Sequence, residues 1–230
     1  MLRFSYLLSL VFLLGVGVAH AEKVAVIGTG NVGMAIGTEM AGLGHTVIYG
    51  SRSPSSEKTA ELVAKTGDSA SAALPAEAAA EADVIVLAVP GMVTPAVVKD
   101  LGDLSGKLII DATNPLIFEG SPPVVSYGVD TSNGQIVQAL QPEAFVVKAF
   151  NAIPWKRMID PGDPPIVMPL AGNDASAKAR VVEWSNAMGI PTVDIGGIEN
   201  SRVTEQIIVM MLNNQFSQGP KYIVEFRKLD

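Results

Sequence analysis

The chain has no cysteine and only two histidines, His20 and His45, among its 230 residues. Without cysteine it can form no disulfide bond, no thiol nucleophile and no thiolate metal site. With so few histidines it can build neither a multi-histidine metal site nor a Ser-His-Asp triad with a histidine to spare. Any catalysis is therefore expected to proceed without the usual protein nucleophile or imidazole base.

Basic residues are outnumbered as well. The chain has 16 Lys and Arg against 23 Asp and Glu, which gives a formal net charge of −7 at pH 7. A net negative charge repels polyanions, so nucleic acids and anionic membranes are not expected as partners. A small-molecule ligand is the expected partner.

The first residues carry a different signal. Residues 1–21, "MLRFSYLLSLVFLLGVGVAHA", combine an arginine, an apolar run and a small-x-small ending. This pattern is typical of a signal peptide that is cleaved after Ala21. The run is shorter than the ~20 residues that span a bilayer, which disfavours the alternative of an uncleaved anchor. We expect an exported protein, periplasmic or extracellular, with no stable membrane association after cleavage if the leader functions, and a cytoplasmic one otherwise.

After the leader, short β-branched runs alternate with helix-length segments. The predicted strands are 23–28, 46–50, 83–89, 107–112, 145–150, 165–172 and 192–197. The predicted helices are 31–43, 56–65, 93–101, 132–140, 174–188 and one from about residue 201. Continuous apolar strands between helices indicate a parallel sheet covered on both faces. The fold class is therefore α/β, with a doubly wound, mainly parallel Rossmann sheet.

Gly28, Gly30 and Gly33 form a G-x-G-x-x-G motif between the first predicted strand and the first predicted helix. Gly28 permits a tight turn, Gly30 lets the backbone approach a pyrophosphate, and Gly33 lets the helix pack on the strand. The amino end of the helix then faces the phosphates. With both flanks in place the motif predicts a dinucleotide site, and a strand-to-helix turn without a ligand is the alternative.

The second predicted strand ends in Gly50-Ser51-Arg52-Ser53. A site for NAD places Asp or Glu at this point to hold the ribose 2′-hydroxyl, and this segment has neither. The guanidinium of Arg52 and the neighbouring hydroxyls suit a 2′-phosphate instead. The predicted cofactor is NADP(H), and a solvated arginine in a turn is the alternative.

The proline-rich segment 151–165 is the predicted boundary between two parts. An NADP-binding Rossmann domain covers residues 22–150, and a smaller C-terminal α/β part, residues 151–230, completes the substrate cleft. One sheet running through both parts is the alternative. Two further strand ends, at Val89-Pro90 and before Asn114, are expected to border the cofactor, because ligands of such sheets lie beyond the carboxyl ends of the strands. Asn114 either donates to a nicotinamide amide or forms a turn before Pro115.

Three other side chains admit two interpretations each. Lys148 lies in an apolar strand, where it needs an ion-pair partner or a wet cleft. Trp155 either stacks on a ligand ring or packs against the protein. Glu205 either faces inward from the last helix or lies on its surface, and the Met-rich run of that helix predicts a buried face or a homodimer interface. His45 is expected in a surface turn.

Several stretches resemble, in order and spacing, the coenzyme F420-dependent NADP oxidoreductase family. They are AVIGTGNVG, GSR, ADVIVLAVPG, LIIDATNPL, VVKAFNAI, AGND and DIGGIENSR, with the ending GPKYIVEFRKL. The resemblance implies hydride transfer between NADPH and a deazaflavin, coenzyme F420, in a cleft between the two parts. It places Thr29, Asn31 and Val32 at the pyrophosphate, Ser51 and Arg52 at the 2′-phosphate, Val89 and Pro90 at the adenosine, and Asn114, Asn151 and Ala149 near the nicotinamide.

Such a reaction requires the protein to position the two reactants, here through Asn114 and Asn151, because the cofactors carry the chemistry. A more distant likeness to the NADPH-binding domains of membrane ferric reductases makes a flavin another candidate acceptor. The predicted function is an NADPH-dependent oxidoreductase with a small-molecule hydride acceptor. The alternative is a non-catalytic NADP-binding module or sensor.

Overall fold

The structure is a computed structural model that describes residues 21–119, 123–216, 219 and 224–227. The predicted signal peptide therefore lies outside the described residues, apart from Ala21. Among the helices in the described ranges, none combines the length and the apolarity needed to cross a membrane.

Eight strands form one sheet in the order β10-β9-β8-β5-β4-β1-β2-β3. Their bounds are β1 (Lys23–Ile27), β2 (Thr46–Gly50), β3 (Ala70–Ala73), β4 (Val84–Leu87), β5 (Leu108–Asp111), β8 (Phe145–Lys148), β9 (Met168–Gly172) and β10 (Thr192–Asp194). The strands from β3 to β8 are parallel, whereas β9 runs antiparallel to β8 and β10 runs parallel to β9. A separate hairpin joins β6 (Leu116–Ile117) and β7 (Val124–Val125). The predicted doubly wound, mainly parallel Rossmann sheet is confirmed.

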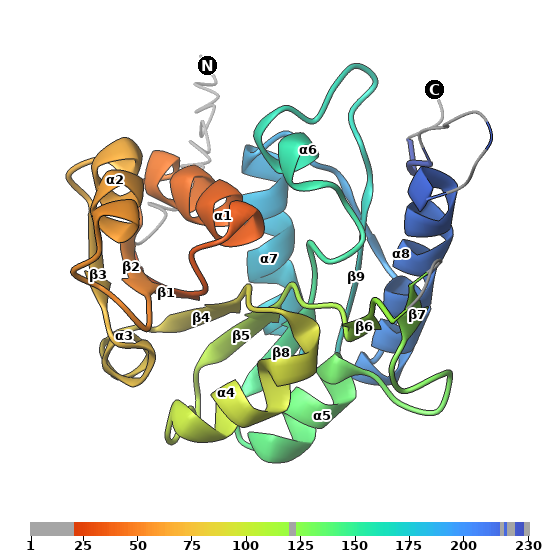
Figure 1. Ribbon diagram of the computed structural model, residues 1–230, viewed down its shortest axis with the longest axis horizontal. Helices are drawn as coiled ribbons and strands as arrows, with labels where there is room; N and C mark the ends of the chain where they lie inside the picture. Colours follow the sequence, from red (N-terminus) through yellow and green to blue (C-terminus); the bar gives the residue numbers. More distant parts are fainter. Residues whose placement is uncertain (1–20, 120–122, 217–218, 220–223, 228–230) are drawn as a thin grey trace, which may run out of the picture.

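Helices cover both faces of the sheet (Figure 1). One face carries α1 (Asn31–Gly42), α2 (Glu57–Thr66), α6 (Trp155–Ile159) and α7 (Ala175–Ala187). The other carries α3 (Pro75–Glu81), α4 (Thr94–Asp100) and α5 (Asn133–Leu140). The last helix, α8 (Ser201–Phe216), packs beside α5, β7 and β9. Two short 3-10 turns, η1 (Gly91–Val93) and η2 (Ile198–Asn200), precede α4 and α8.

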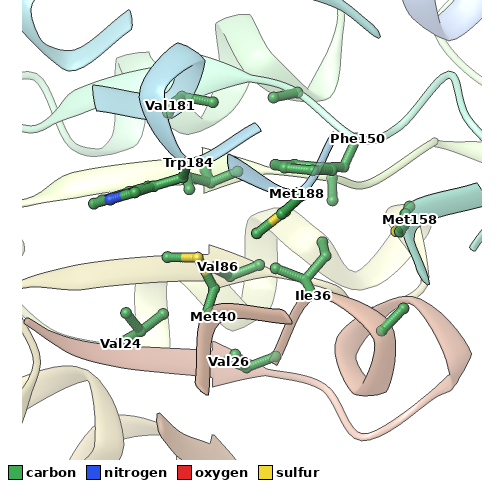
Figure 2. Close-up of a cluster of buried hydrophobic side chains, with 14 of the residues drawn as sticks. Val24, Val26, Ile36, Met40, Val86, Phe150, Met158, Val181, Trp184 and Met188 are labelled. Carbon is green, nitrogen blue, oxygen red and sulfur yellow. The ribbon is translucent and has the colours of Figure 1, made fainter. Parts of the chain in front are cut away.

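Alternation along the buried strands divides the core into two clusters. In β1, Val24 and Val26 belong to the cluster under α1 and α7, while Ala25 and Ile27 belong to the cluster under α3, α4 and α5. Figure 2 shows the first cluster, in which Trp184 of α7 lies over the strands. Because both faces are covered, apolar residues occupy consecutive positions in the middle of β1 rather than every second one.

Helix starts agree closely with the sequence. The side chains of Ser56, Ser132 and Asp174 each accept a hydrogen bond from the backbone N–H three residues on, at the starts of α2, α5 and α7. Such N-caps satisfy backbone donors that the first helical turn leaves without partners. The three predicted starts are thereby confirmed.

Several boundaries differ from the prediction, and the strands predicted over 83–89, 165–172 and 192–197 are shorter than expected. The strand predicted over 145–150 ends at Lys148, because Phe150 has a φ of 64°, a left-handed value that cannot continue a strand. The segment predicted as irregular, 151–165, contains the helix α6. Beyond this segment β9 and β10 extend the same sheet, as in the alternative of one continuous sheet. The division into domains at residue 150 stays a prediction.

Candidate functional site

The predicted site residues gather at one edge of the sheet, beyond the carboxyl ends of neighbouring parallel strands. The glycine loop, residues 28–33, follows β1. The other predicted site residues follow β2, β4, β5 and β8. The chain runs outward from β1 to β3 and then returns to form β4 on the other side of β1. This point of reversal is where open α/β sheets bind ligands.

The three glycines of the loop have different surroundings. Gly28 has a φ of 120°, and a Cβ there would lie 2.4 Å from the carbonyl oxygen of Ala88. A Cβ at Gly33 would lie 2.0 Å from the carbonyl oxygen of Gly28. Gly28 and Gly33 therefore allow the backbone segments to pack closely. At Gly30 a Cβ would meet no atom of the described residues within 4 Å, so among them this position faces open space.

The amino end of α1 starts in that open space. Gly30 is the N-cap residue of α1, and no side chain of the described residues caps the first turn. The first turn, beginning with Asn31 and Val32, also contains no acidic residue. Free backbone N–H groups and the positive end of the helix dipole make this turn suitable for an anion such as a pyrophosphate.

The loop after β2 presents an arginine. Ser51 is buried, and its hydroxyl lies 3.3 Å from the hydroxyl of Thr59 and accepts the N–H of Ser53 at 3.1 Å. Ser51 therefore holds the turn, while Arg52 and Ser53 are exposed. Arg52 forms no ion pair with any residue that the structure describes. Its guanidinium is available for an anionic ligand.

Asn114 and Asn151 are hydrogen-bonded to each other. Asn114 Nδ2 donates to the carbonyl oxygen of Asn151 at 2.8 Å, and Asn151 Nδ2 donates to Asn114 Oδ1 at 2.9 Å. Asn151 is buried, whereas Asn114 is partly exposed and keeps a second N–H hydrogen for another acceptor. Asn114 therefore has a donor left over, whereas Asn151 holds the Asn114 side chain in place.

The remaining predicted contacts differ in their exposure. Val89 is partly buried and Pro90 is exposed at the start of η1. Gly91, the next residue, packs so tightly that a Cβ there would lie 1.9 Å from the carbonyl oxygen of Asn114. Ala149 has no exposed surface, since its methyl group is buried in the core. Its side chain is therefore closed off from a ligand, and the expected position of Ala149 near the nicotinamide stays a prediction.

Lys148 and Glu205 are both fully buried and form an ion pair in which Lys148 Nζ lies 2.7 Å from Glu205 Oε1. Asp111 completes the cluster, with Oδ2 at 2.9 Å from Lys148 Nζ. The ion-pair interpretation of Lys148 and the inward-facing interpretation of Glu205 are confirmed. Asp111 was not among the predicted site residues, although a charged residue at the end of an apolar strand predicts a buried partner at Asp111 just as it does at Lys148.

The pKa of Glu205 is raised. Burial is the largest cause, the Lys148 ammonium opposes it, and the negative charge of Asp111 adds to it. Burial raises the pKa of the Tyr127 phenol, and the nearby negative charge of Glu205 raises this pKa further. The folded protein therefore holds the proton of Glu205 more strongly than the unfolded chain does.

This shift predicts a pH-dependent stability. Above the ordinary value of 4.5 and up to the raised pKa, the folded state binds more protons, so the free energy of unfolding falls as pH rises. The slope is at most about 1.4 kcal/mol per pH unit. We expect urea titrations across this window to show a steeper fall for the wild type than for Glu205→Gln. Glu39, whose pKa burial also raises, contributes equally to both proteins, so equal slopes would contradict the assignment.

His45 does not lie in a surface turn as expected. It is buried at the opposite, amino-terminal edge of the sheet, where its Nδ1 accepts the N–H of Glu22 at 3.2 Å. Its ring also packs edge-on against Trp184, with ring centroids 5.2 Å apart. Trp155 begins α6 and packs against the core, which is the packing interpretation. His45 is therefore not part of the site.

The outer side of α8 borders a hollow that lies apart from the proposed site residues. This hollow of about 470 Å³ is lined by Val129, Arg202, Val203, Gln206, Ile207 and Met210. Val203 and Met210 are half exposed. This stripe agrees with an apolar face on the last helix, and the homodimer stays a prediction.

Comparison with known proteins places the chain in a family. The profile of the family described as "NADP oxidoreductase coenzyme F420-dependent" matches residues 23–115. The F420-dependent NADP reductase of Methanothermobacter thermautotrophicus is 31% identical over 207 residues, covering 83% of this chain and 88% of the relative. A crystal structure from Arthrobacter sp. FB24, described as a candidate F420-dependent NADP-reductase, superposes with a TM-score of 0.78 at 32% identity, covering 83% of this chain and 92% of that one.

A second kind of relative is a longer protein. Metalloreductase STEAP3 of Rattus norvegicus is 30% identical over 194 residues, which cover 84% of this chain but only 38% of the relative. The chain thus spans well under half of that protein, whereas it spans most of the two relatives named for coenzyme F420. By this likeness along most of its length, the chain belongs to the F420-dependent NADP reductase family of NADP-dependent oxidoreductases.

Proposed function

We propose that the protein binds NADP(H) at the carboxyl edge of its sheet and transfers hydride between it and coenzyme F420. The observation that carries the proposal is the joint placement, at neighbouring strand ends, of a helix start and an arginine that have no side-chain cap and no ion pair within the described part of the chain, together with a partly exposed asparagine. The residues fit NADP(H), because open space at Gly30 adjoins the free N–H groups of α1. The choice of coenzyme F420 as the acceptor rests on the similarity to relatives that are named for this coenzyme.

Each residue has a distinct task in this proposal. The first turn of α1 binds the pyrophosphate through backbone N–H groups, and Arg52 binds the 2′-phosphate. Asn114 orients the nicotinamide carboxamide through its remaining N–H, and Asn151 fixes Asn114. When bound, NADPH supplies the hydride and the deazaflavin accepts it, so the protein needs no acid or base of its own at the reacting carbon.

A flavin is the second candidate acceptor. It follows from the resemblance to the NADPH-binding domains of membrane ferric reductases, and Metalloreductase STEAP3 matches 84% of this chain. The glycine loop, Arg52 and Asn114 act on NADP(H) and do not discriminate between acceptors. The choice between a deazaflavin and a flavin therefore requires an assay.

The assay follows the loss of NADPH absorbance with coenzyme F420, FMN, FAD or no acceptor. We expect rapid oxidation with coenzyme F420 and only slow oxidation without an acceptor. Oxidation with a flavin alone would assign the second acceptor. Tight binding of NADPH with no oxidation by any acceptor would overturn the enzymatic proposal in favour of a non-catalytic NADP-binding module or sensor.

Arg52→Ala is expected to weaken the binding of NADPH but not of NADH. A hydrogen bond to a charged group contributes about 1.5–3 kcal/mol, which corresponds to roughly tenfold to a hundredfold in the dissociation constant. NADH lacks the 2′-phosphate and loses nothing. Calorimetric titration of both cofactors measures the contrast, and equal losses for the two would remove Arg52 from the 2′-phosphate site.

A further inference from the structure

Three charged side chains are buried together beneath the proposed site. Asp111 ends β5, Lys148 ends the adjacent strand β8, and the two residues are paired in the sheet register. Glu205 reaches Lys148 from α8. All three side chains have no exposed surface. An ion cluster of this kind is costly to bury and needs well-placed partners.

The contacts of the cluster converge on the loop that carries Asn114. Lys148 Nζ donates to the carbonyl oxygen of Thr113 at 2.5 Å, and Thr113 is the residue before Asn114. Asp111 Oδ1 accepts the N–H of Thr113 at 2.9 Å and its hydroxyl at 2.6 Å. Thr113 is thus held at its carbonyl, its amide and its side chain.

The same cluster reaches α5 and the turn η1. Glu205 accepts the backbone N–H groups of Asn133 at 3.2 Å and Gly134 at 3.4 Å, at the start of α5. Asn133 Nδ2 in turn donates to the Thr113 hydroxyl and to the carbonyl oxygen of Gly91, both at 2.8 Å. One connected network therefore joins α8 and α5 to the segments that surround Asn114.

We infer that Lys148 and Glu205 are positioning residues, which fix the Thr113–Asn114 loop against the β8 loop and so set the place of the nicotinamide without touching it. The inference rests on the proposed function. Its physical reason is that, among the described residues, every hydrogen-bond or ion-pair partner of the Glu205 carboxyl is a donor: the Lys148 ammonium and the N–H groups of Asn133 and Gly134. An acceptor-only carboxylate satisfies all three, whereas an amide would place its NH2 group against one of them.

The test is Glu205→Gln, measured for kcat with NADPH and acceptor and for the binding of NADPH and of 2′,5′-ADP, which lacks the nicotinamide. We expect kcat to fall by about tenfold to a hundredfold, because a displacement of about 1 Å has this effect on hydride transfer. NADPH binding is expected to weaken by a factor of about 3–10. Binding of 2′,5′-ADP is expected to stay unchanged, because Arg52 and α1 lie at other strand ends.

Matched variants separate positioning from general damage. Glu199→Gln makes the same change at an exposed carboxyl just before α8 and is expected to leave every value unchanged. Glu205→Asp keeps an acceptor-only group and is expected to retain part of the wild-type kcat. It therefore tests the inference even if Glu205→Gln is too unstable to assay. Thermal melting of each variant shows whether it is folded under the assay conditions.

Two outcomes would overturn the inference. An unchanged kcat in folded Glu205→Gln would show that the cluster has no influence on the site. An equal weakening of NADPH and 2′,5′-ADP would show general loosening rather than displacement of the nicotinamide. If the wild type binds NADPH but no acceptor oxidises it, only the proposed function fails, and the contrast between the two ligands still decides the inference.

Discussion

Replacing Lys148 by methionine is expected to lower the free energy of unfolding by about 3–5 kcal/mol. Methionine fills a similar volume but carries no charge, so Asp111 and Glu205 would stay buried without their shared cation. Removing one partner of a buried ion pair is costly for this reason, even where the intact pair contributes little. Urea denaturation of both proteins at neutral pH measures the difference.

A partly exposed ion pair provides the control. Lys178 Nζ lies 2.8 Å from Asp194 Oδ2, and the Asp194 side chain is 53% exposed. Lys178→Met is therefore expected to lower the free energy of unfolding by at most about 1 kcal/mol. The deficit of Lys148→Met should also shrink toward acidic pH, where the stranded carboxyls take up protons. A loss no larger than that of Lys178→Met would contradict the description of the cluster as a desolvated ion pair.

The parts of the fold that the sequence predicted depend on local chemistry. Ser56, Ser132 and Asp174 cap helices a few residues away, and the glycine loop lies within one strand-turn-helix unit. These features involve neighbours along the chain, so their residue types and spacing are sufficient to predict them. The positions of the site residues at the strand ends follow from the order of the strands in a doubly wound sheet.

Contacts between distant segments could not be predicted in the same way. A lysine in an apolar strand indicates that a partner exists, but only packing brings Glu205 of the last helix to Lys148. His45 has the sequence of a turn residue, and it is buried because Trp184 from a far segment covers it. The antiparallel direction of β9 likewise depends on how the chain after α6 returns to the sheet.

Phe150 gives the second large expected effect, a loss of about 3–5 kcal/mol in the free energy of unfolding on substitution by alanine. Its ring is buried in the core, where Figure 2 shows it near Trp184 and Met188. Its backbone has a φ of 64°, which costs a non-glycine residue about 1–2 kcal/mol. Packing of the ring therefore holds the turn that leads from β8 to Asn151.

Two further variants test that explanation. Phe145→Ala makes the same change at the other end of β8, where the ring is 40% exposed, and is expected to cost about 1 kcal/mol or less. Phe150→Gly loses the same ring as Phe150→Ala but removes the steric cost of the positive φ, so it is expected to be the more stable of the two by about 1 kcal/mol. At a position with negative φ the order would be reversed, because glycine loses more backbone entropy on folding. Alanine exceeding glycine would thus show that the left-handed turn before Asn151 is not kept in solution, and with it the geometry by which Asn151 supports Asn114.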